Sequence, residues 1–156
     1  MTKLYRMFSE GEGFMDIKRD KYLNDLINRM HNGMIKVVTG IRRCGKSYLL
    51  FNIFKNYLLE QGVPASHIIM IELDQRKNKK YRDPDVILDY IESLIEEDGQ
   101  YYIMLDEVQM LQEFEEVLNS LLHIRNADVY VTGSNSKFLS KDVITEFRGR
   151  GDEIHI

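Results

Sequence analysis

The feature that most constrains the fold of this chain is the segment 40–47, which reads Gly-Ile-Arg-Arg-Cys-Gly-Lys-Ser. It matches the pattern G-x-x-x-x-G-K-[ST], in which Gly40 and Gly45 allow a tight turn whose backbone N–H groups point at phosphate oxygens. Lys46 supplies a positive charge for the β- and γ-phosphates, and the Ser47 hydroxyl can bind Mg²⁺. The candidate nucleotide-binding residues are Gly40, Ile41, Arg42, Arg43, Cys44, Gly45, Lys46, Ser47 and Tyr48.

The neighbouring sequence has the context that such a loop needs. Residues 35–39 are short, β-branched and mostly apolar, as in a buried strand of a parallel sheet. After the loop, apolar residues recur at helical spacing and stop at Gly62, with Pro64 just beyond. The order strand, glycine-bearing loop and helix places the positive end of the helix dipole at the loop, where it favours an anion.

Further strands and helices alternate along the rest of the chain. Apolar runs predict strands at 68–73, 101–105, 129–131 and 153–156. Amphipathic segments predict helices at 20–33, 83–98, 114–122 and 140–147. Residues 1–16 are expected to form a loosely ordered leader before a domain at 17–156. The alternation predicts an α/β fold with a parallel sheet of about five strands and helices on both faces.

Two acidic residues, Asp106 and Glu107, follow the predicted strand at 101–105. A carboxylate at the end of a neighbouring strand can hold Mg²⁺ opposite the Ser47 hydroxyl, so Ser47 and Asp106 are the candidate metal ligands. The adjacent Glu107 is the candidate general base that orients and deprotonates the attacking water. The alternative is that both acids simply begin a solvated loop.

The segment Thr132-Gly133-Ser134-Asn135 ends the predicted fourth strand. A polar side chain there can sense the γ-phosphate and help to hold the attacking water, and Asn135 is the first candidate, with Ser134 as the second. The alternative is an ordinary strand-to-helix turn in which Asn135 or Ser136 caps the helix.

Arg148 and Arg150 flank a glycine after the last predicted helix. A guanidinium reaching a neighbouring subunit's γ-phosphate accelerates hydrolysis as an arginine finger, and Arg150 is the candidate. The alternative is a solvated turn, or a structural ion pair with Asp152 or Glu153. The candidate catalytic residues are therefore Glu107, Lys46, Asn135 and Arg150.

The sequence lacks a motif for recognising guanine. A GTPase would carry an Asn/Thr-Lys-x-Asp motif, and the nearest segment, Asn78-Lys79-Lys80-Tyr81, lacks the aspartate. ATP is therefore favoured over GTP. The basic run of Lys77, Lys79, Lys80 and Arg82 is expected to be a solvated loop, with nucleic-acid contact as the alternative.

The composition is that of a globular protein, at 44% hydrophobic and 29% charged residues. The formal net charge of −4 argues against a nucleic-acid motor. Cys44 is the single cysteine, which excludes an intrachain disulfide and favours a reducing cytoplasm. No apolar run in the sequence approaches the length of a membrane span.

Several of these segments together resemble the AAA-type ATPase domain of a bacterial and archaeal family in which this domain precedes a C-terminal domain of unknown function. The matching segments are 17–23, 39–47, 105–109, 132–136 and 149–150. The resemblance implies a sheet of the additional-strand, catalytic-glutamate class, and MgATP hydrolysis. It also implies that the chain continues past Ile156 into the second domain.

These features predict Mg²⁺-dependent ATP binding and hydrolysis, coupled to conformational change of the C-terminal domain or a partner. Assembly into a homo-oligomer would bring a trans arginine to the site, and no membrane partner is expected. Two alternatives stay open. One is an ATP-binding regulatory switch with little turnover, and the other is a P-loop kinase acting on a small acceptor.

Overall fold

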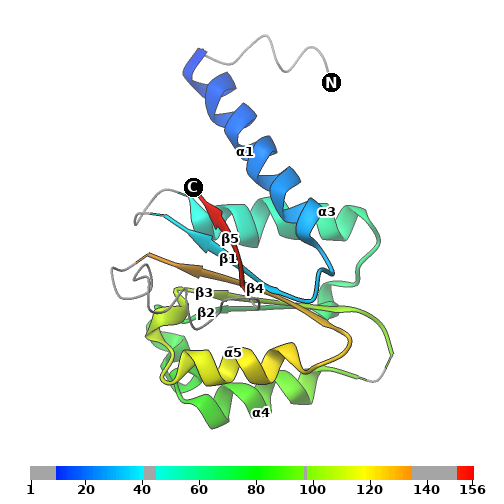
Figure 1. Ribbon diagram of the computed structural model, residues 1–156, viewed down its shortest axis with the longest axis vertical. Coiled ribbons are helices and arrows are strands. Elements are labelled where there is room, and N and C mark those ends of the chain that lie inside the picture. Colours follow the sequence, from blue (N-terminus) through cyan, green and yellow to red (C-terminus); the bar gives the residue numbers. More distant parts are fainter. Residues whose placement is uncertain (1–9, 41–44, 97, 135–150) are drawn as a thin grey trace.

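The computed structural model describes residues 10–40, 45–96, 98–134 and 151–156, which form a five-stranded parallel sheet with helices on both faces (Figure 1). The strands are β1 (Ile35–Thr39), β2 (Ile68–Glu72), β3 (Tyr101–Asp106), β4 (Ala127–Gly133) and β5 (Gly151–His155). The α-helices are α1 (Glu10–Arg29), α2 (Lys46–Tyr48), α3 (Lys55–Glu60), α4 (Pro84–Leu94) and α5 (Phe114–Leu122). Shorter turns of helix are η2 (Leu49–Phe54), η3 (Ala65–His67), η4 (Arg76–Arg82) and η5 (Val108–Met110).

The strand order is β2-β3-β4-β1-β5, and every pairing is parallel. Strand β4 therefore lies between β1, which leads into the phosphate-binding loop, and β3, which carries the acidic pair. Because all strands run in one direction, their carboxyl ends meet at one edge, where parallel α/β sheets bind ligands. The predicted five-stranded α/β fold with an additional strand in the middle is confirmed.

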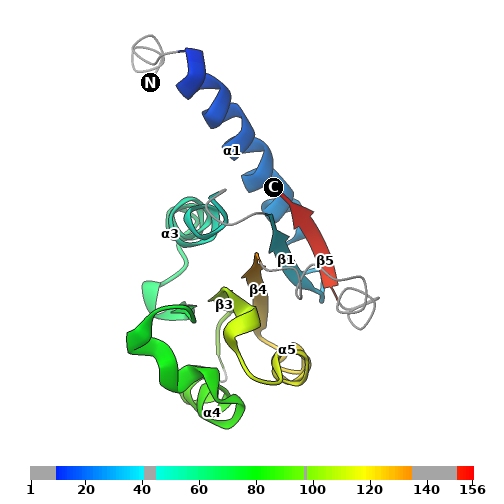
Figure 2. The same ribbon diagram turned by 90° about the vertical axis from the view of Figure 1, so that its left-hand side faces the viewer.

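Alternate residues of the central strands supply two separate cores. Ile103 and Leu105 of β3 pack in one cluster with α4 and α5, whereas Tyr102 and Met104 pack in the other with η2 and α3. Figures 1 and 2 show the corresponding layers, with α3 on one side of the sheet and α4 and α5 on the other. Both faces of β3 are buried, which explains why its sequence is apolar at successive positions.

The helical segments differ from their predicted bounds. Helix α1 begins at Glu10, within the segment expected to be a loose leader, and extends away from the sheet (Figure 2). Once a helix is anchored at one end, adding turns costs less than starting it. The segment that contains the basic run forms the 3₁₀ helix η4 instead of an open loop, and α4 ends at Leu94, short of 98. The predicted helix at 140–147 lies outside the described residues.

Strand β4 is longer than predicted and runs from Ala127 to Gly133. It pairs with β3 on one side and with β1 on the other, so backbone partners are available beyond its apolar centre. This extension brings Thr132 and Gly133 into the sheet beside the end of β1. Within the described residues, no helix combines the length and apolarity needed to cross a membrane.

A polar cluster joins the end of α1 to the opposite edge of the sheet, where the strands begin. The Lys36 side chain, in β1, is fully buried and forms an ion pair with Asp128 of β4. Asp128 Oδ2 also accepts hydrogen bonds from the Tyr130 hydroxyl, at 2.5 Å, and from the His31 N–H, at 3.0 Å. Arg29 pairs with Asp152 of β5 at 2.9 Å, so the last turn of α1 is held to the sheet.

Candidate functional site

The described part of the phosphate-binding loop has the predicted strand-to-helix geometry. β1 ends at Thr39, and α2 begins at Lys46 and continues through η2 into α3. Gly45, immediately before the helix, has a φ of 98°, a left-handed conformation that glycine adopts without strain. The predicted contacts of Ile41, Arg42, Arg43 and Cys44 lie outside the described residues.

The side chain of Lys46 turns back over the loop. Only 4% of this residue is exposed, and its Nζ donates a hydrogen bond to the Gly40 carbonyl oxygen at 3.0 Å. The ammonium group therefore lies next to the point where the chain leaves β1. A positive charge held at the end of a strand that leads into a helix is suited to polyphosphate.

The two predicted metal ligands come from distant segments of the sequence and lie together in the structure. Ser47 Oγ lies 2.8 Å from Asp106 Oδ1 and 2.9 Å from Asp106 Oδ2 and donates to this carboxylate. A hydroxyl and a carboxylate are hard oxygen donors of the kind that Mg²⁺ prefers, and Mg²⁺ usually keeps several waters and substrate oxygens as its other ligands. No group of three histidine, cysteine or acidic side chains suited to a metal occurs in the described parts of the chain. The donor set thus fits Mg²⁺ bound together with phosphate.

The electrostatic environment of Asp106 also suits a cation. Burial raises the pKa of its carboxyl above the ordinary range, and the negative charges of Glu107 and Asp74 act in the same direction. Hydrogen bonds from Thr132 and Ser47 act against this rise in pKa and stabilise the ionised form. A divalent cation at this place would offset both the burial and the neighbouring negative charges.

Glu107, the predicted general base, leaves the end of β3 in a strained conformation. Its φ of 54° is in the left-handed region, which costs a non-glycine residue free energy and is often found at functional sites. Its carboxylate Oε2 accepts a hydrogen bond from Ser134 Oγ at 2.7 Å and another from the Gln109 side-chain amide. The second candidate for the sensing residue, Ser134, therefore contacts the proposed base directly, whereas Asn135 lies outside the described residues.

Thr132 is a site residue that sequence reasoning missed. Its hydroxyl donates to Asp106 Oδ1 at 2.5 Å and accepts from the Glu107 N–H at 2.9 Å, so one side chain orients both acidic residues. The apolar run predicts a strand only up to Val131, but Thr132 also lies on β4, beside Val38 of β1 in the sheet register. The available signal was a lone hydroxyl residue at the end of an apolar strand.

Gln109 is the second residue that was missed. It follows Glu107 by two positions and donates to its carboxylate, while its own Oε1 is buried with no hydrogen-bond partner in the described structure. A buried polar oxygen without a partner is uncommon and requires a local explanation. Here the side chain is turned so that its donor group, and not its oxygen, faces Glu107.

The remaining predicted residues lie at the margin of the site or beyond the described residues. Tyr48 is 48% exposed, and the guanidinium of Arg19 in α1 lies 5.0 Å from the centre of its ring. Arg148 and Arg150 lie outside the described residues. Their alternative ion-pair partners have other contacts, since Asp152 pairs with Arg29 and Glu153 accepts a hydrogen bond from Thr39 at 2.7 Å.

Comparison with known protein families places this geometry in a wider class. The AAA domain family matches residues 32–156, a range that contains all five strands of the sheet. This chain belongs to the AAA domain family. Nucleotide binding and ATPase activity are thereby supported at the level of the family. The C-terminal domain that the resemblance implied stays a prediction.

Two relatives are similar to this AAA domain chain over most of its length. An uncharacterized protein of Haemophilus influenzae is 32% identical over 141 residues, which cover 90% of this chain and 35% of that protein. An uncharacterized protein of Methanocaldococcus jannaschii is 28% identical over 138 residues, which cover 85% of this chain and 29% of that protein. The chain therefore spans about a third of the length of these relatives.

Solved structures of low sequence identity share the fold. The Aeropyrum pernix ORC2 protein, in ADPNP-ADP complexes, aligns with a TM-score of 0.60 at 16% identity, covering 89% of this chain and 46% of that chain. A Thermotoga maritima protein related to the DNA polymerase III gamma subunit aligns with a TM-score of 0.59 at 14% identity, covering 86% and 45%. At such identities the similarity shows a common fold.

Proposed function

We propose that this chain is the ATPase domain of a longer protein and that it binds and hydrolyses ATP with Mg²⁺. The observation that carries the proposal is the hydrogen-bonded network in which Ser47, Asp106, Thr132 and Glu107 meet at the carboxyl edge of the sheet. These residues come from the segment that follows β1, from the end of β3 and the residue after it, and from β4 between the two strands. Such convergence supports a site built around a phosphate-bound metal.

Each residue of the network has a role in this reaction. Lys46 would bind the β- and γ-phosphates, and Ser47 with Asp106 would hold Mg²⁺, which would neutralise negative charge on the phosphates. Glu107 would orient the attacking water and accept its proton. Ser134 and Gln109 both bind its Oε2, which leaves Oε1 without a hydrogen bond from the described residues.

Residues outside the described structure complete the proposal. Asn135 would sense the γ-phosphate beside Ser134, and Arg150 would reach the nucleotide of a neighbouring copy. Adenine nucleotide is favoured by the lack of a guanine motif, and the Aeropyrum ORC2 structure holds ADPNP and ADP. Because the relatives are about three times as long as this chain, we propose that hydrolysis moves a further domain or a partner.

The nucleotide site is tested by calorimetric titration of MgATP into the protein, with MgGTP as the comparison. We expect saturable binding that is selective for ATP and is lost in Lys46→Ala, because this change removes the charge that faces the phosphates. Equal binding of MgATP by Lys46→Ala would contradict the assignment. Absence of binding by a protein that circular dichroism shows to be folded would also contradict it.

Glu107→Gln tests whether the protein hydrolyses ATP through the proposed base. We expect the rate of phosphate release to fall by about 10²- to 10⁴-fold, with the affinity for MgATP retained. Glu113→Gln is a matched control, because Glu113 is also a glutamate with positive φ but lies at the start of α5, outside the network. Unchanged turnover in Glu107→Gln would exclude Glu107 as the base.

A second candidate function, an ATP-dependent switch with little turnover, is favoured by one observation. The carboxylate of Glu107 is held by Ser134 and Gln109, and such contacts restrain a base from approaching water. In that case the wild-type protein would bind MgATP but release phosphate no faster than Glu107→Gln. A P-loop kinase would instead transfer the phosphate to a small acceptor and would tolerate the Gln substitution.

A further inference from the structure

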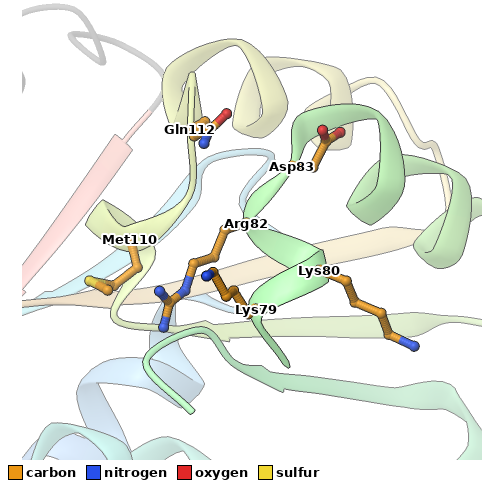
Figure 3. A pocket seen from close by; sticks show the side chains of 6 residues that line it. All are labelled: Lys79, Lys80, Arg82, Asp83, Met110 and Gln112. Carbon is orange, nitrogen blue, oxygen red and sulfur yellow. The ribbon is translucent and has the colours of Figure 1, made fainter. Parts of the chain in front are cut away.

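An open pocket of about 570 Å³ lies between η4 and the segment that contains η5 (Figure 3). It is lined by Lys79, Lys80, Arg82, Asp83, Met110 and Gln112. The basic run expected to be a solvated loop thus folds into a helical turn that brings three of its four cations to one hollow. The fourth cation, Lys77, is on the same turn but does not line the pocket.

Hydrogen bonds to backbone carbonyl groups hold the wall of this pocket, which we call the basic pocket. Arg82 donates from Nε to the Leu73 carbonyl at 2.8 Å, and its own carbonyl accepts from the Gln112 N–H at 2.9 Å. These bonds tie η4 to the end of β2 and to the chain beyond η5. In Figure 3 the side chains of Lys79 and Arg82 point toward the same space, whereas Lys80 extends away from them.

The charge of the basic pocket is opposite in sign to that of the chain. Three cationic side chains against one carboxylate, that of Asp83, leave a formal excess of two positive charges, while the whole chain carries −4. Asp83 is also occupied as the cap of α4, where its Oδ1 accepts from the N–H groups of Asp85 and Val86. A local positive hollow on an acidic protein attracts an anionic ligand selectively.

The other lining groups indicate which kind of anion. Sites for single-stranded nucleic acid combine cations with aromatic rings on which bases stack, and no aromatic side chain is among the described residues that line this pocket. Met110 is 39% exposed and offers an adaptable apolar surface, and the exposed amide of Gln112 can hydrogen-bond a peptide group. These groups match a carboxylate-bearing peptide with an apolar side chain better than a phosphate backbone.

We propose that the basic pocket binds an acidic peptide segment of a partner protein, with its carboxylates on Lys79 and Arg82 and an apolar side chain on Met110. The site is separate from the nucleotide-binding residues. It adjoins them through η5, since the Met110 N–H donates to the Glu107 carbonyl at 3.0 Å. The binding itself does not require ATP hydrolysis, so this proposal stands or fails independently of the proposed function.

The test is fluorescence anisotropy of a short labelled peptide of alternating glutamate and leucine, titrated with the whole chain in the absence of nucleotide. We expect saturable binding that weakens with salt and falls about tenfold in Lys79→Glu. Lys77→Glu is the matched control, because it makes the same charge reversal on the same helical turn outside the pocket, and it should retain wild-type affinity. Lys46→Ala should bind the peptide as the wild type does.

Three results would overturn the proposal. Equal weakening by Lys77→Glu and Lys79→Glu would show a diffuse attraction to the positive surface. Absence of saturable binding of the peptide would exclude the site. Displacement of the peptide by an oligothymidylate of equal charge that binds more tightly would identify a nucleic-acid surface instead.

Replacing Met110 with serine should weaken binding of the glutamate-leucine peptide but leave binding of a peptide of glutamate and glycine unaffected.

Discussion

Thr132 illustrates how one hydroxyl on a neighbouring strand can organise two acidic side chains. Its hydroxyl donates its single proton to Asp106, and one of its lone pairs accepts a hydrogen bond from the backbone N–H of Glu107. The two acids are adjacent in sequence, but only a group between them in space fixes their relative orientation. The sequence motif identifies the two acidic residues, and a residue of the middle strand β4 orients them.

Asp106 is the single residue whose ionisation should affect stability most clearly. Because burial raises the pKa of its carboxyl above the ordinary 3.8, the folded state binds more protons than the unfolded state between those two values. The free energy of unfolding should therefore fall as pH rises through this interval and stay lowered above it. Asp106→Asn, which removes the buried charge, should be more stable than wild type at neutral pH and lose this advantage toward pH 3.8.

The measurement is the urea midpoint of both proteins across this pH range, with a chelator present to remove divalent ions. Asp89→Asn provides the control, since Asp89 is exposed on α4, and its substitution should leave the midpoint nearly unchanged throughout. A gain for Asp106→Asn that is equal at acid and neutral pH would show that the effect does not arise from ionisation.

At the scale of elements, two ion pairs that differ in burial join parts of the fold: one joins two strands of the sheet, and the other joins α1 to the sheet. Lys36 and Asp128 join β1 to β4 and are almost completely buried, and burial lowers the pKa of the Lys36 amine. Arg29 and Asp152 join α1 to β5 near the surface. A buried charge that loses its partner is costly, whereas exposed pairs contribute little.

Removing one partner of each pair should separate these cases. Lys36→Met should lower the free energy of unfolding by about 3–5 kcal/mol, because the buried Asp128 carboxylate loses its counter-charge. Arg29→Met should lower it by about 1 kcal/mol or less, because solvent replaces the lost contact. Urea denaturation of the two variants measures both values. Similar losses would mean that the burial of the Lys36 pair does not determine its contribution.

At the scale of the whole molecule, nucleotide binding should stabilise the fold as a unit, because the proposed site residues come from the segment that follows β1, from the end of β3 and from the end of β4. A ligand at about 100 times its Kd adds about 2.7 kcal/mol, which corresponds to a rise in Tm of about 5–10 °C for a domain of this size. Thermal unfolding with MgATP should show this rise in the wild type and not in Lys46→Ala. An equal rise in both proteins would place the nucleotide elsewhere.

The net negative charge of the molecule does not reveal the positive charge of the basic pocket. The net charge of −4 argues against a nucleic-acid motor. Three cations of the basic run nevertheless line one pocket together with Met110 and Gln112. Net charge is a sum over the surface and does not describe its distribution.

The sequence by itself determined the features that depend on local spacing. The glycines and lysine of the loop, the apolar strand before it and the amphipathic helix after it are all read within about 25 residues. The acidic pair at the end of β3 and the beginning of a helix near residue 83 were predicted in the same way, and in the structure Asp83 caps α4. These patterns also sufficed for the parallel α/β fold class, because alternating strands and helices allow few arrangements.

Only the tertiary structure decided which distant residues share the site. The strand order inserts β4 between β1 and β3, and the register then places Thr132 beside Asp106 and Ser134 beside Glu107. The extent of α1 and the basic pocket depend likewise on contacts between segments far apart in the chain. A sequence pattern specifies what each segment can form locally, but hydrogen bonds and burial between segments depend on register, which is settled when the whole sheet packs.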